Sequence, residues 1–272
     1  MTAELLMLVA LVALAGAFGG VLAGLLGVGG GIVIVPVLEF ALGAAGVPAD
    51  VRMHLAVGTS LASIVPTALS SSRAHRRRGA VDEQIARRWI PPIAAGAAAG
   101  AVAAAFVSGG VLRAVFGVVA LAVAAVMLLR PEPQAAGAGR TVTPGPRGWP
   151  AGIGFVSALM GIGGGTLSVP ALSRRGLPIH RAVGTSAWLG LWIALPAAAG
   201  FAWLGLGRPG LPPGCLGFVS LPGLAVLVPA SVLAAPFGAR IAHGLSRRAL
   251  RAAFGVFLLL VALRMLWGSL AA

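Results

Sequence analysis

Length, composition and charge exclude a water-soluble fold for this chain. Of its 272 residues, 58% are hydrophobic and only 10% are charged, whereas about a quarter of the residues of a soluble domain are charged. The formal net charge is +14, and a high positive charge is typical of nucleic-acid-binding proteins. Here, however, the arginines lie in loops between apolar runs, as they do in membrane proteins. We therefore expect an all-α polytopic membrane protein that binds the lipid bilayer and no nucleic acid.

Residues that hold metals or cofactors are scarce in this chain. Its one cysteine, Cys215, excludes an intramolecular disulfide and a cysteine-based metal cluster. All six acidic residues lie before position 133, and the sequence has no HExxH, GxSxG or Walker motif. We expect no metal, no cofactor and no enzymatic activity.

Apolar runs follow one another along the whole chain, near the length of about 20 residues with which a helix crosses the hydrocarbon layer. The first run contains Glu4 and no basic residue at its start, and it is too long for a cleavable signal peptide. Two of the runs are short or broken, so we expect about 8–10 membrane segments. The long runs are 3–26, 54–71, 89–107, 111–129, 182–206, 218–238 and 252–268, and the short or broken ones are 29–43 and 150–172.

The second half of the chain repeats the first. Three matches occur in the same order in both halves, which predicts a first repeat over 1–130, a linker over 131–148 and a second repeat over 149–272. The matched segments are Gly27–Leu38 with Gly161–Leu172, His54–Ser60 with His180–Ser186, and Leu112–Val118 with Leu250–Val256.

Loop charges predict that the two repeats have opposite orientations in the membrane. The loop 71–88 is strongly basic, whereas its equivalent at 206–217 holds only Arg208. The uncharged turn at 108–110 is replaced in the second half by Ser246-Arg247-Arg248. Because basic loops remain in the cytoplasm, this exchange of charge indicates inverted topology.

Inversion requires an odd number of crossings in each repeat. Each repeat would then be a glycine-broken helix or hairpin followed by three transmembrane helices. The charges favour two short helices that meet at the glycines within 150–172, although one span remains the alternative. We expect a multi-pass protein of the bacterial cytoplasmic (inner) membrane whose C-terminus is extracytoplasmic. The loops expected in the cytoplasm are 71–88, 130–149, 173–181 and 243–251.

The two glycine breaks are the candidate substrate site. Unpaired backbone groups are costly in lipid, so a run of glycine persists only where protein or a water-filled cavity satisfies the backbone. A helix that restarts after the break presents N–H groups and a partial positive charge, which favour an anion. Close helix packing is the alternative role of these glycines. The candidates are Gly29, Gly30 and Gly31 in the first break and Gly163, Gly164 and Gly165 in the second.

Hydroxyl groups near the breaks are the other candidate ligands. Each repeat has a Gly-Thr-Ser segment in the next helix, where the hydroxyls bind either the substrate or the carbonyls of their own helix. Two more hydroxyls follow the second break, where the first has isoleucine, which predicts an asymmetric site. These residues are Thr59, Ser60, Thr185 and Ser186, together with Thr166 and Ser168.

Other residues are candidates for breaking helices, for gating or for coupling. Pro36 and Pro170 follow the glycines at the same distance in both repeats and are expected to keep the restarted helices short. Charged and titratable residues inside membrane segments are often functional. The alternative for the charged and titratable candidates is a position at the membrane interface, and the alternative for the tryptophans is interfacial or lipid-facing packing. The gating or coupling candidates are Glu39, His54, His180, Trp188 and Trp192.

These doubled motifs resemble the TauE/SafE sulfite-exporter family of membrane transporters. The resemblance rests on Gly-Val-Gly-Gly-Gly with a downstream Val-Pro-Val-Leu, then Ala-Val-Gly-Thr-Ser, with both motifs repeated once, and it covers nearly the whole chain. It implies a permease for a small sulfur-containing or organic anion such as sulfite or a sulfonate. The arginine-rich 71–88 loop and the prolines at 209, 212 and 213 depart modestly from the family's pattern.

Secondary transport of a small anion by alternating access is the function that the sequence favours. The partners expected are that anion and a coupling ion, either H+ or Na+, and the sequence says nothing about oligomeric state. An anion channel is one alternative, because two fixed hairpins also suit a selectivity filter. A membrane enzyme and a sensory or structural subunit without transport are the others.

Overall fold

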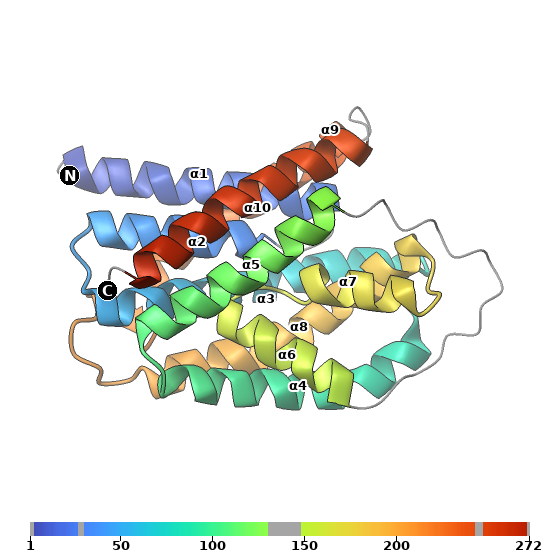
Figure 1. The fold of residues 1–272 in the computed structure, drawn as a ribbon, viewed down its shortest axis with the longest axis horizontal. Helices are drawn as coiled ribbons and strands as arrows, with labels where there is room; N and C mark the ends of the chain where they lie inside the picture. The colour runs from blue at the N-terminus through green and yellow to red at the C-terminus, as the bar shows by residue number, and fades with distance from the viewer. Residues whose placement is uncertain (1–2, 27–29, 130–147, 243–246, 271–272) are drawn as a thin grey trace.

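The computed structural model describes residues 3–26, 30–129, 148–242 and 247–270. It is an all-α protein in the part of the chain that it describes, apart from one two-stranded hairpin. The helices lie mainly along the long axis of the molecule (Figure 1). They are α1 (Ala3–Leu26), α2 (Gly31–Ala44), α3 (Ala49–Arg77), α4 (Glu83–Ala105), α5 (Gly109–Leu129), α6 (Gly148–Met160), α7 (Gly165–Arg174), α8 (Ile179–Leu204), α9 (Leu221–Ala242) and α10 (Arg247–Leu270).

Four described helices are long and apolar enough to cross a membrane, namely α3, α5, α8 and residues Ala252–Ser269 of α10. Four shorter apolar helical stretches lie in α1, α2, α6 and α9. The apolar composition of these helices agrees with a polytopic membrane protein. The predicted linker 131–148 falls almost entirely on residues outside the described ranges, as do Gly29 and part of the predicted loop 243–251.

The segment 150–172 is a hairpin of two short helices. α6 ends at Met160 and α7 begins at Gly165; α6 crosses the middle of the view in Figure 1 and α7 lies to its right. Gly161, in the turn between them, has a φ of 66°, a left-handed conformation that favours glycine. The amide of Ile162 donates to the carbonyl of Ser157, which closes the end of α6. The hairpin prediction is therefore confirmed.

Two features of the structure differ from the sequence prediction, one helix boundary and one additional hairpin. α3 continues to Arg77, so most of the predicted basic loop 71–88 belongs to α3 and α4, and only residues 78–82 connect these helices. The connection between α8 and α9 contains a short antiparallel hairpin, β1 (Cys215–Leu216) and β2 (Val219–Ser220), which hydropathy did not indicate. Helical arginines at the end of α3 are exposed, so the basic helix end extends beyond the apolar part of α3.

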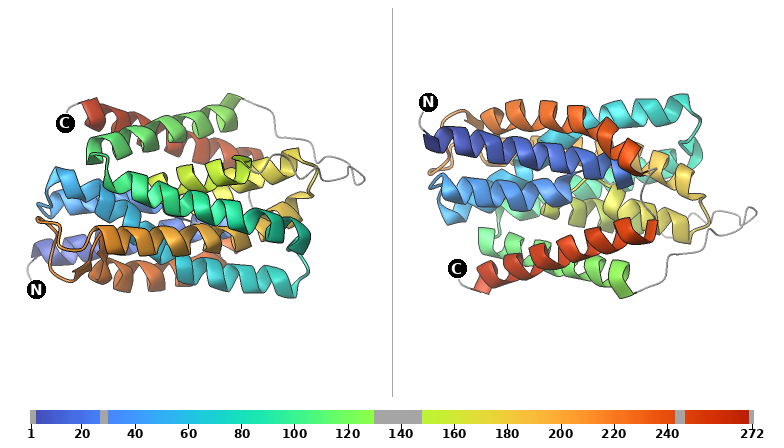
Figure 2. Two further views of the ribbon diagram at one scale, coloured as in Figure 1. Left: turned by 90° about the horizontal axis from the view of Figure 1, so that it is seen from below. Right: turned by 90° about the horizontal axis from the view of Figure 1, so that it is seen from above.

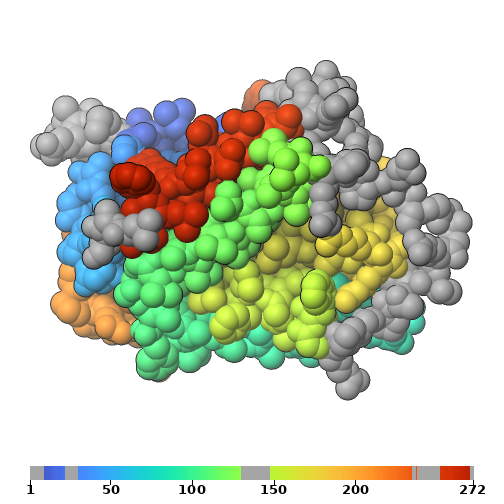
Figure 3. All heavy atoms as spheres, in the orientation of Figure 1, coloured from blue at the N-terminus to red at the C-terminus, as the bar shows by residue number. Residues whose placement is uncertain are grey.

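Small residues allow pairs of helices to pack closely. α1 packs beside α9, as the right view in Figure 2 shows, and α5 packs along α10, as Figures 2 and 3 show. A Cβ on Gly20 of α1 would overlap the backbone of Ser231 in α9, and one on Gly154 of α6 would overlap the carbonyl of Ile93 in α4. Small residues let helix backbones approach this closely in membrane proteins.

The same contact recurs at positions that the sequence repeat makes equivalent. A Cβ on Gly117 of α5 would lie 2.7 Å from the Leu266 side chain of α10, and one on Gly255 of α10 would lie 2.8 Å from that of Leu128 in α5. Gly117 and Gly255 correspond in the third sequence match, and continuing the match makes Leu128 correspond to Leu266. The contacts between α5 and α10 are thus reciprocal.

The close packing of α6 on α4 predicts different effects for two glycines of the same helix. Gly154→Leu has no room for its side chain, and we expect it to destabilise the protein by about 3 kcal/mol. Gly152→Leu is the matched control, since a Cβ there meets nothing within 4 Å. Thermal unfolding in detergent measures both variants, and equal unfolding temperatures would contradict the packing described here.

Candidate functional site

The two glycine breaks touch each other in the middle of the molecule. A Cβ placed on Gly31, at the start of α2, would lie 2.5 Å from the carbonyl oxygen of Gly161 and 3.0 Å from the Cα of Ile162. The hydroxyl of Ser60 on α3 donates to the same Gly161 carbonyl at 2.7 Å. The backbone of the second break is therefore packed directly against the first repeat, and glycine is required for this contact.

The start of α7 carries backbone donors without helical acceptors. Gly164 is the N-cap residue, and no side chain caps the helix there. The amide of Ser168 donates to the Gly164 carbonyl at 2.7 Å, so the amides of residues 165–167 precede the first helical hydrogen bond. These amides and the helix dipole give this end of α7 a partial positive charge.

Helix geometry places two buried serines near this helix start. A Cβ on Gly164 would lie 3.3 Å from the Ser168 Oγ and 3.4 Å from the Cα of Gly190 on α8. Because α7 and α8 run in opposite directions, moving four residues along each helix places Ser168 opposite Ser186. Both side chains are fully buried, and neither hydroxyl has a hydrogen-bond partner in the described part of the protein. A buried polar group without a partner costs about 1–3 kcal/mol, so a ligand that bonds both would be strongly favoured.

Two further buried hydroxyls border the second break. Thr166 lies on the first turn of α7, on the opposite face from Ser168, and Ser157 lies one turn before the break in α6. Neither hydroxyl has a partner among the described residues. Ser157 was not among the predicted site residues; its position, one turn before the glycines, was the only signal.

The first break has an apolar environment instead. Ile32 and Ile34 occupy the positions of Thr166 and Ser168, and both are buried. Ile64 fills the space beside the breaks, since its side chain would lie 3.1 Å from a Cβ on Gly31 and 3.3 Å from one on Gly163. Gly30 packs against the backbone of α1 at Gly19. Among the described residues, the unpartnered hydroxyls therefore lie at the second break, while the predicted asymmetry of the substrate site stays a prediction.

Thr59 and Thr185 connect the two halves of the chain. The Oγ1 of Thr59 accepts the amide of Ser220, the residue before α9, at 2.9 Å. The Oγ1 of Thr185 accepts the amide of Asp82, the residue before α4, also at 2.9 Å. Gly58 and Gly184, one residue earlier, allow the adjacent backbone to approach. These threonine oxygens already have partners, in contrast to those of Ser168 and Ser186.

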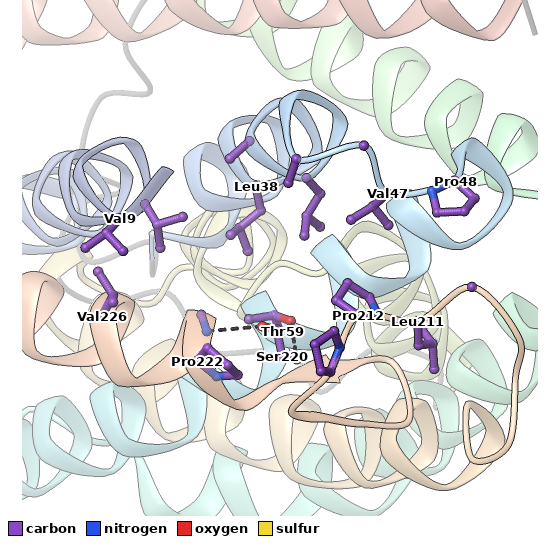
Figure 4. Close-up of a pocket in the computed structure, with 18 residues that line it drawn as sticks. Val9, Leu38, Val47, Pro48, Thr59, Leu211, Pro212, Ser220, Pro222 and Val226 are labelled. Carbon is purple, nitrogen blue, oxygen red and sulfur yellow. Dashed lines mark hydrogen bonds between the residues drawn. The ribbon is translucent and has the colours of Figure 1, made fainter. Parts of the chain in front are cut away.

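A cavity of about 630 Å³ opens between α1, α2, α3, α9 and the loop that carries the hairpin β1–β2. Its lining is mainly apolar, with Leu38 and Val226 among the residues that point into it in Figure 4. Thr59 and Ser220 supply the hydroxyl groups of the lining. Thr59 precedes Ser60, whose hydroxyl binds the Gly161 carbonyl, so the cavity ends one residue from the second break.

The two prolines do not end the helices in which they lie. Pro36 is the sixth residue of α2 and Pro170 the sixth residue of α7, and both helices continue past them. At this position proline removes one amide donor after the first turn, and the helix nevertheless continues in both copies. The chain is broken at the glycines, and α2 and α7 are short, with 14 and 10 residues; that the prolines keep them short stays a prediction.

Glu39 belongs to a buried ion cluster. Its Oε1 lies 2.8 Å from Nη2 of Arg113 on α5 and 3.7 Å from Nε of Arg52 on α3. Arg113 also donates to the carbonyl of Gly268 in α10 at 3.0 Å. Glu39 and Arg113 are 8% and 6% exposed. The cluster thus ties α2 to α3, α5 and α10 and lies apart from the serines of the second break.

The two matched histidines have different environments. His54 is buried and its Nε2 lies 2.9 Å from the Ala104 carbonyl at the end of α4, while its ring stacks on Phe218. His180 is exposed at the start of α8. Only His54 is therefore placed to hold helices together.

The tryptophan pair lies away from the serines. The rings of Trp188 and Trp192 pack edge to face at 6.1 Å, and the guanidinium of Arg76 lies 4.9 Å from the Trp188 ring. On a helix with 3.6 residues per turn, both tryptophans project from the side of α8 opposite Ser186 and Gly190. The structure does not bring them to the glycine break.

The sequence profile described as sulfite exporter TauE/SafE matches residues 12–265. The chain belongs to this family. A probable membrane transporter protein of Haemophilus influenzae is 32% identical over 255 residues, which cover 93% of this chain and 96% of that protein. The probable membrane transporter protein YunE of Bacillus subtilis is 30% identical over 58% of this chain and 64% of its own length. No solved structure matches the chain.

Family and relatives agree with the helical, apolar structure, and this TauE/SafE protein is a multi-pass membrane transporter. A probable membrane transporter protein of Methanocaldococcus jannaschii, 28% identical over 67% of this chain, has the same description.

The buried ion cluster predicts a strong asymmetry between single and double substitutions. Arg113→Met leaves Glu39 with only the more distant Arg52, and we expect it to lower the free energy of unfolding by about 3 kcal/mol. Glu39→Leu combined with Arg113→Met removes both charges and should recover most of this loss. Arg76→Met, in an exposed ion pair with Glu83, is the control and should change stability by less than about 1 kcal/mol. Additive effects in denaturant titrations would refute this role of the cluster.

Proposed function

We propose that this TauE/SafE protein is a secondary transporter for a small sulfur-containing or organic anion, such as sulfite or a sulfonate. The anion would bind at the second glycine break, between the start of α7 and the hydroxyls of Ser168 and Ser186. The observation that carries this proposal is that both hydroxyls are buried and unpartnered beside a positively polarised helix start. Hydrogen bonds to an ionised partner are about twice as strong as neutral ones.

Neutral donors suit an anion that must leave again. The groups beside the second break are hydroxyls, backbone amides and apolar side chains such as Ile193. A fixed cation in contact would hold an anion tightly in a low-dielectric interior, whereas hydroxyls and helix dipoles bind it more weakly. A transporter needs such reversible binding, and the amides of residues 165–167 supply directional bonds.

Alternating access between two inverted repeats is the proposed mechanism, and reciprocal contacts support it. The contacts of Gly117 with Leu266 and of Gly255 with Leu128 exchange equivalent positions between the halves. The hydrogen bonds from the Ser220 amide to Thr59 and from the Asp82 amide to Thr185 also join equivalent positions of the two halves, because these residues correspond in the repeat. Contacts related in this way are expected of a two-fold axis, about which the halves can exchange conformations.

The positions of the arginines support a proposed orientation in the membrane. We propose that the connections 78–82 and 175–178, which lie at the same end of the molecule, face the cytoplasm of a bacterial cell. The other end, with the 630 Å³ cavity, would then be extracytoplasmic.

Transport by purified protein in liposomes tests the site. Gly164→Leu places a side chain against Gly190 and Ile193 and should abolish uptake of labelled sulfite or sulfonate. Ser168→Ala and Ser186→Ala should each raise the KM by roughly tenfold or more, because each removes a hydrogen bond to a charged ligand.

Ser72→Ala is the matched control, since the buried Ser72 hydroxyl bonds only the Leu69 carbonyl of its own helix. Its KM should equal that of the unmodified protein. Unimpaired transport by Gly164→Leu, or equal KM values for all three serine variants, would place the substrate elsewhere. Counterflow of labelled substrate should be observed if the protein is a carrier, and its absence alongside flux would indicate a channel.

A further inference from the structure

The basic end of α7 carries a second group of polar atoms without partners. Ser173 Oγ and Arg175 Nη1 are buried and have no hydrogen-bond partner among the described residues. The guanidinium of Arg175 lies 4.9 Å from the centre of the Trp89 ring on α4, and Trp89 is only 3% exposed. Arg175 itself is half-buried. An unpaired guanidinium N–H that is withdrawn from water is a strong donor for an oxyanion.

Arg175 is the C-cap residue of α7, and helical spacing extended by one residue places it on the same side of α7 as the proposed site. Gly164, Ser168 and Arg175 are four and seven residues apart, which places them within about 40° of one another around the helix axis. This face therefore offers backbone amides at the centre of the molecule, then a hydroxyl, then a guanidinium at the basic end. Ser168 and Arg175 each have a buried polar atom without a described partner, so the donors form a row that runs outward from the break.

The equivalent space in the first repeat is open. Continuing the first sequence match by three residues pairs Ala41 with Arg175, and Ala41 lines the 630 Å³ cavity. Continuing the third match back into α4 and α9 pairs Leu227 with Trp89, and Val226 beside Leu227 also lines the cavity. Where one end of the molecule has an open cavity, the other end has Arg175 packed on Trp89.

We propose that Arg175 binds the transported anion on its path between the second break and the basic end, and that the packing of Arg175 on Trp89 closes this path in the present structure. The inference rests on the proposed function and adds a binding residue to it. The ligand class is a small oxyanion. An anion that moves from Ser168 and Ser186 toward the basic end would pair with the guanidinium, and the guanidinium would leave the indole ring as the path opens.

Labelling of a cysteine at the site tests this path without relying on transport. Cys215→Ser removes the only native cysteine, and Ser168→Cys then places one thiol at the site. In membrane vesicles that expose the basic end, the thiol is treated with an anionic reagent, sulfonatoethyl methanethiosulfonate, or a cationic one, trimethylammonioethyl methanethiosulfonate. The ratio of the two labelling rates reports the charge along the path.

Arg175→Gln should lower the ratio of anionic to cationic labelling by about tenfold, because it removes a positive charge from the path. Arg174→Gln is the matched control, an equal loss of charge at an exposed neighbour, and should change the ratio by less than about twofold. Trp89→Leu, which copies the residue of the other repeat, should raise both rates severalfold, and Trp89→Phe should raise them less.

Several outcomes would overturn the proposal. An unchanged ratio in Arg175→Gln, or an equal fall in Arg174→Gln, would show that Arg175 is not on the path and serves only as an interfacial anchor. Unchanged labelling rates in folded Trp89→Leu and Trp89→Phe would show that the packing of Arg175 on Trp89 does not close the path. The absence of labelling at Ser168→Cys and at Ser186→Cys in every variant would exclude a path from the basic end. Absent anion flux in the unmodified protein would instead count against the proposed function, whatever the labelling ratio.

Discussion

A polypeptide backbone inside a bilayer must satisfy its polar groups within the protein, and the structure depends on how two glycine breaks meet this requirement. The breaks are packed against each other: Gly31 lies against the carbonyl oxygen of Gly161. The Ser60 hydroxyl donates a hydrogen bond to the same carbonyl. Side chains larger than hydrogen would separate them. The amides at the start of α7 remain without a helical acceptor, and the unpartnered hydroxyls of Ser168 and Ser186 lie beside them. Structural necessity and the proposed ligand site thus coincide at the second break.

The two halves use equivalent positions differently, and this difference gives the molecule a direction. Isoleucines occupy the first break where the second has Thr166 and Ser168, so only one break is polar. At the ends of the molecule the relation is similar. Ala41 lines an open cavity, whereas Arg175 in the equivalent position packs on Trp89. Reciprocal contacts such as those of Gly117 and Gly255 preserve the framework while the site and its access diverge.

Much of the architecture could be predicted because hydropathy and repetition record it directly. The hairpin of α6 and α7 followed from loop charges, and the confirmed family from the doubled glycine motif. The pairing of helices could not be predicted, since close approach at Gly20 or Gly154 depends on which backbone lies opposite. Ser157 and Arg175 were missed for the same reason: a lone serine or arginine acquires meaning only when its burial and its lack of a partner are known. Pro36 and Pro170 lie inside α2 and α7, and both helices are short, so their expected role in limiting helix length stays a prediction.

The central claim is that a small oxyanion lies between Ser168 and Ser186 at the start of α7. A crystal structure with bound selenite, the heavier analogue of sulfite, tests it most directly through the anomalous signal of selenium. The account predicts one strong peak from which the selenite oxygens reach both serine hydroxyls within about 3 Å. A peak in the cavity beside Thr59, with none at the second break, would contradict it.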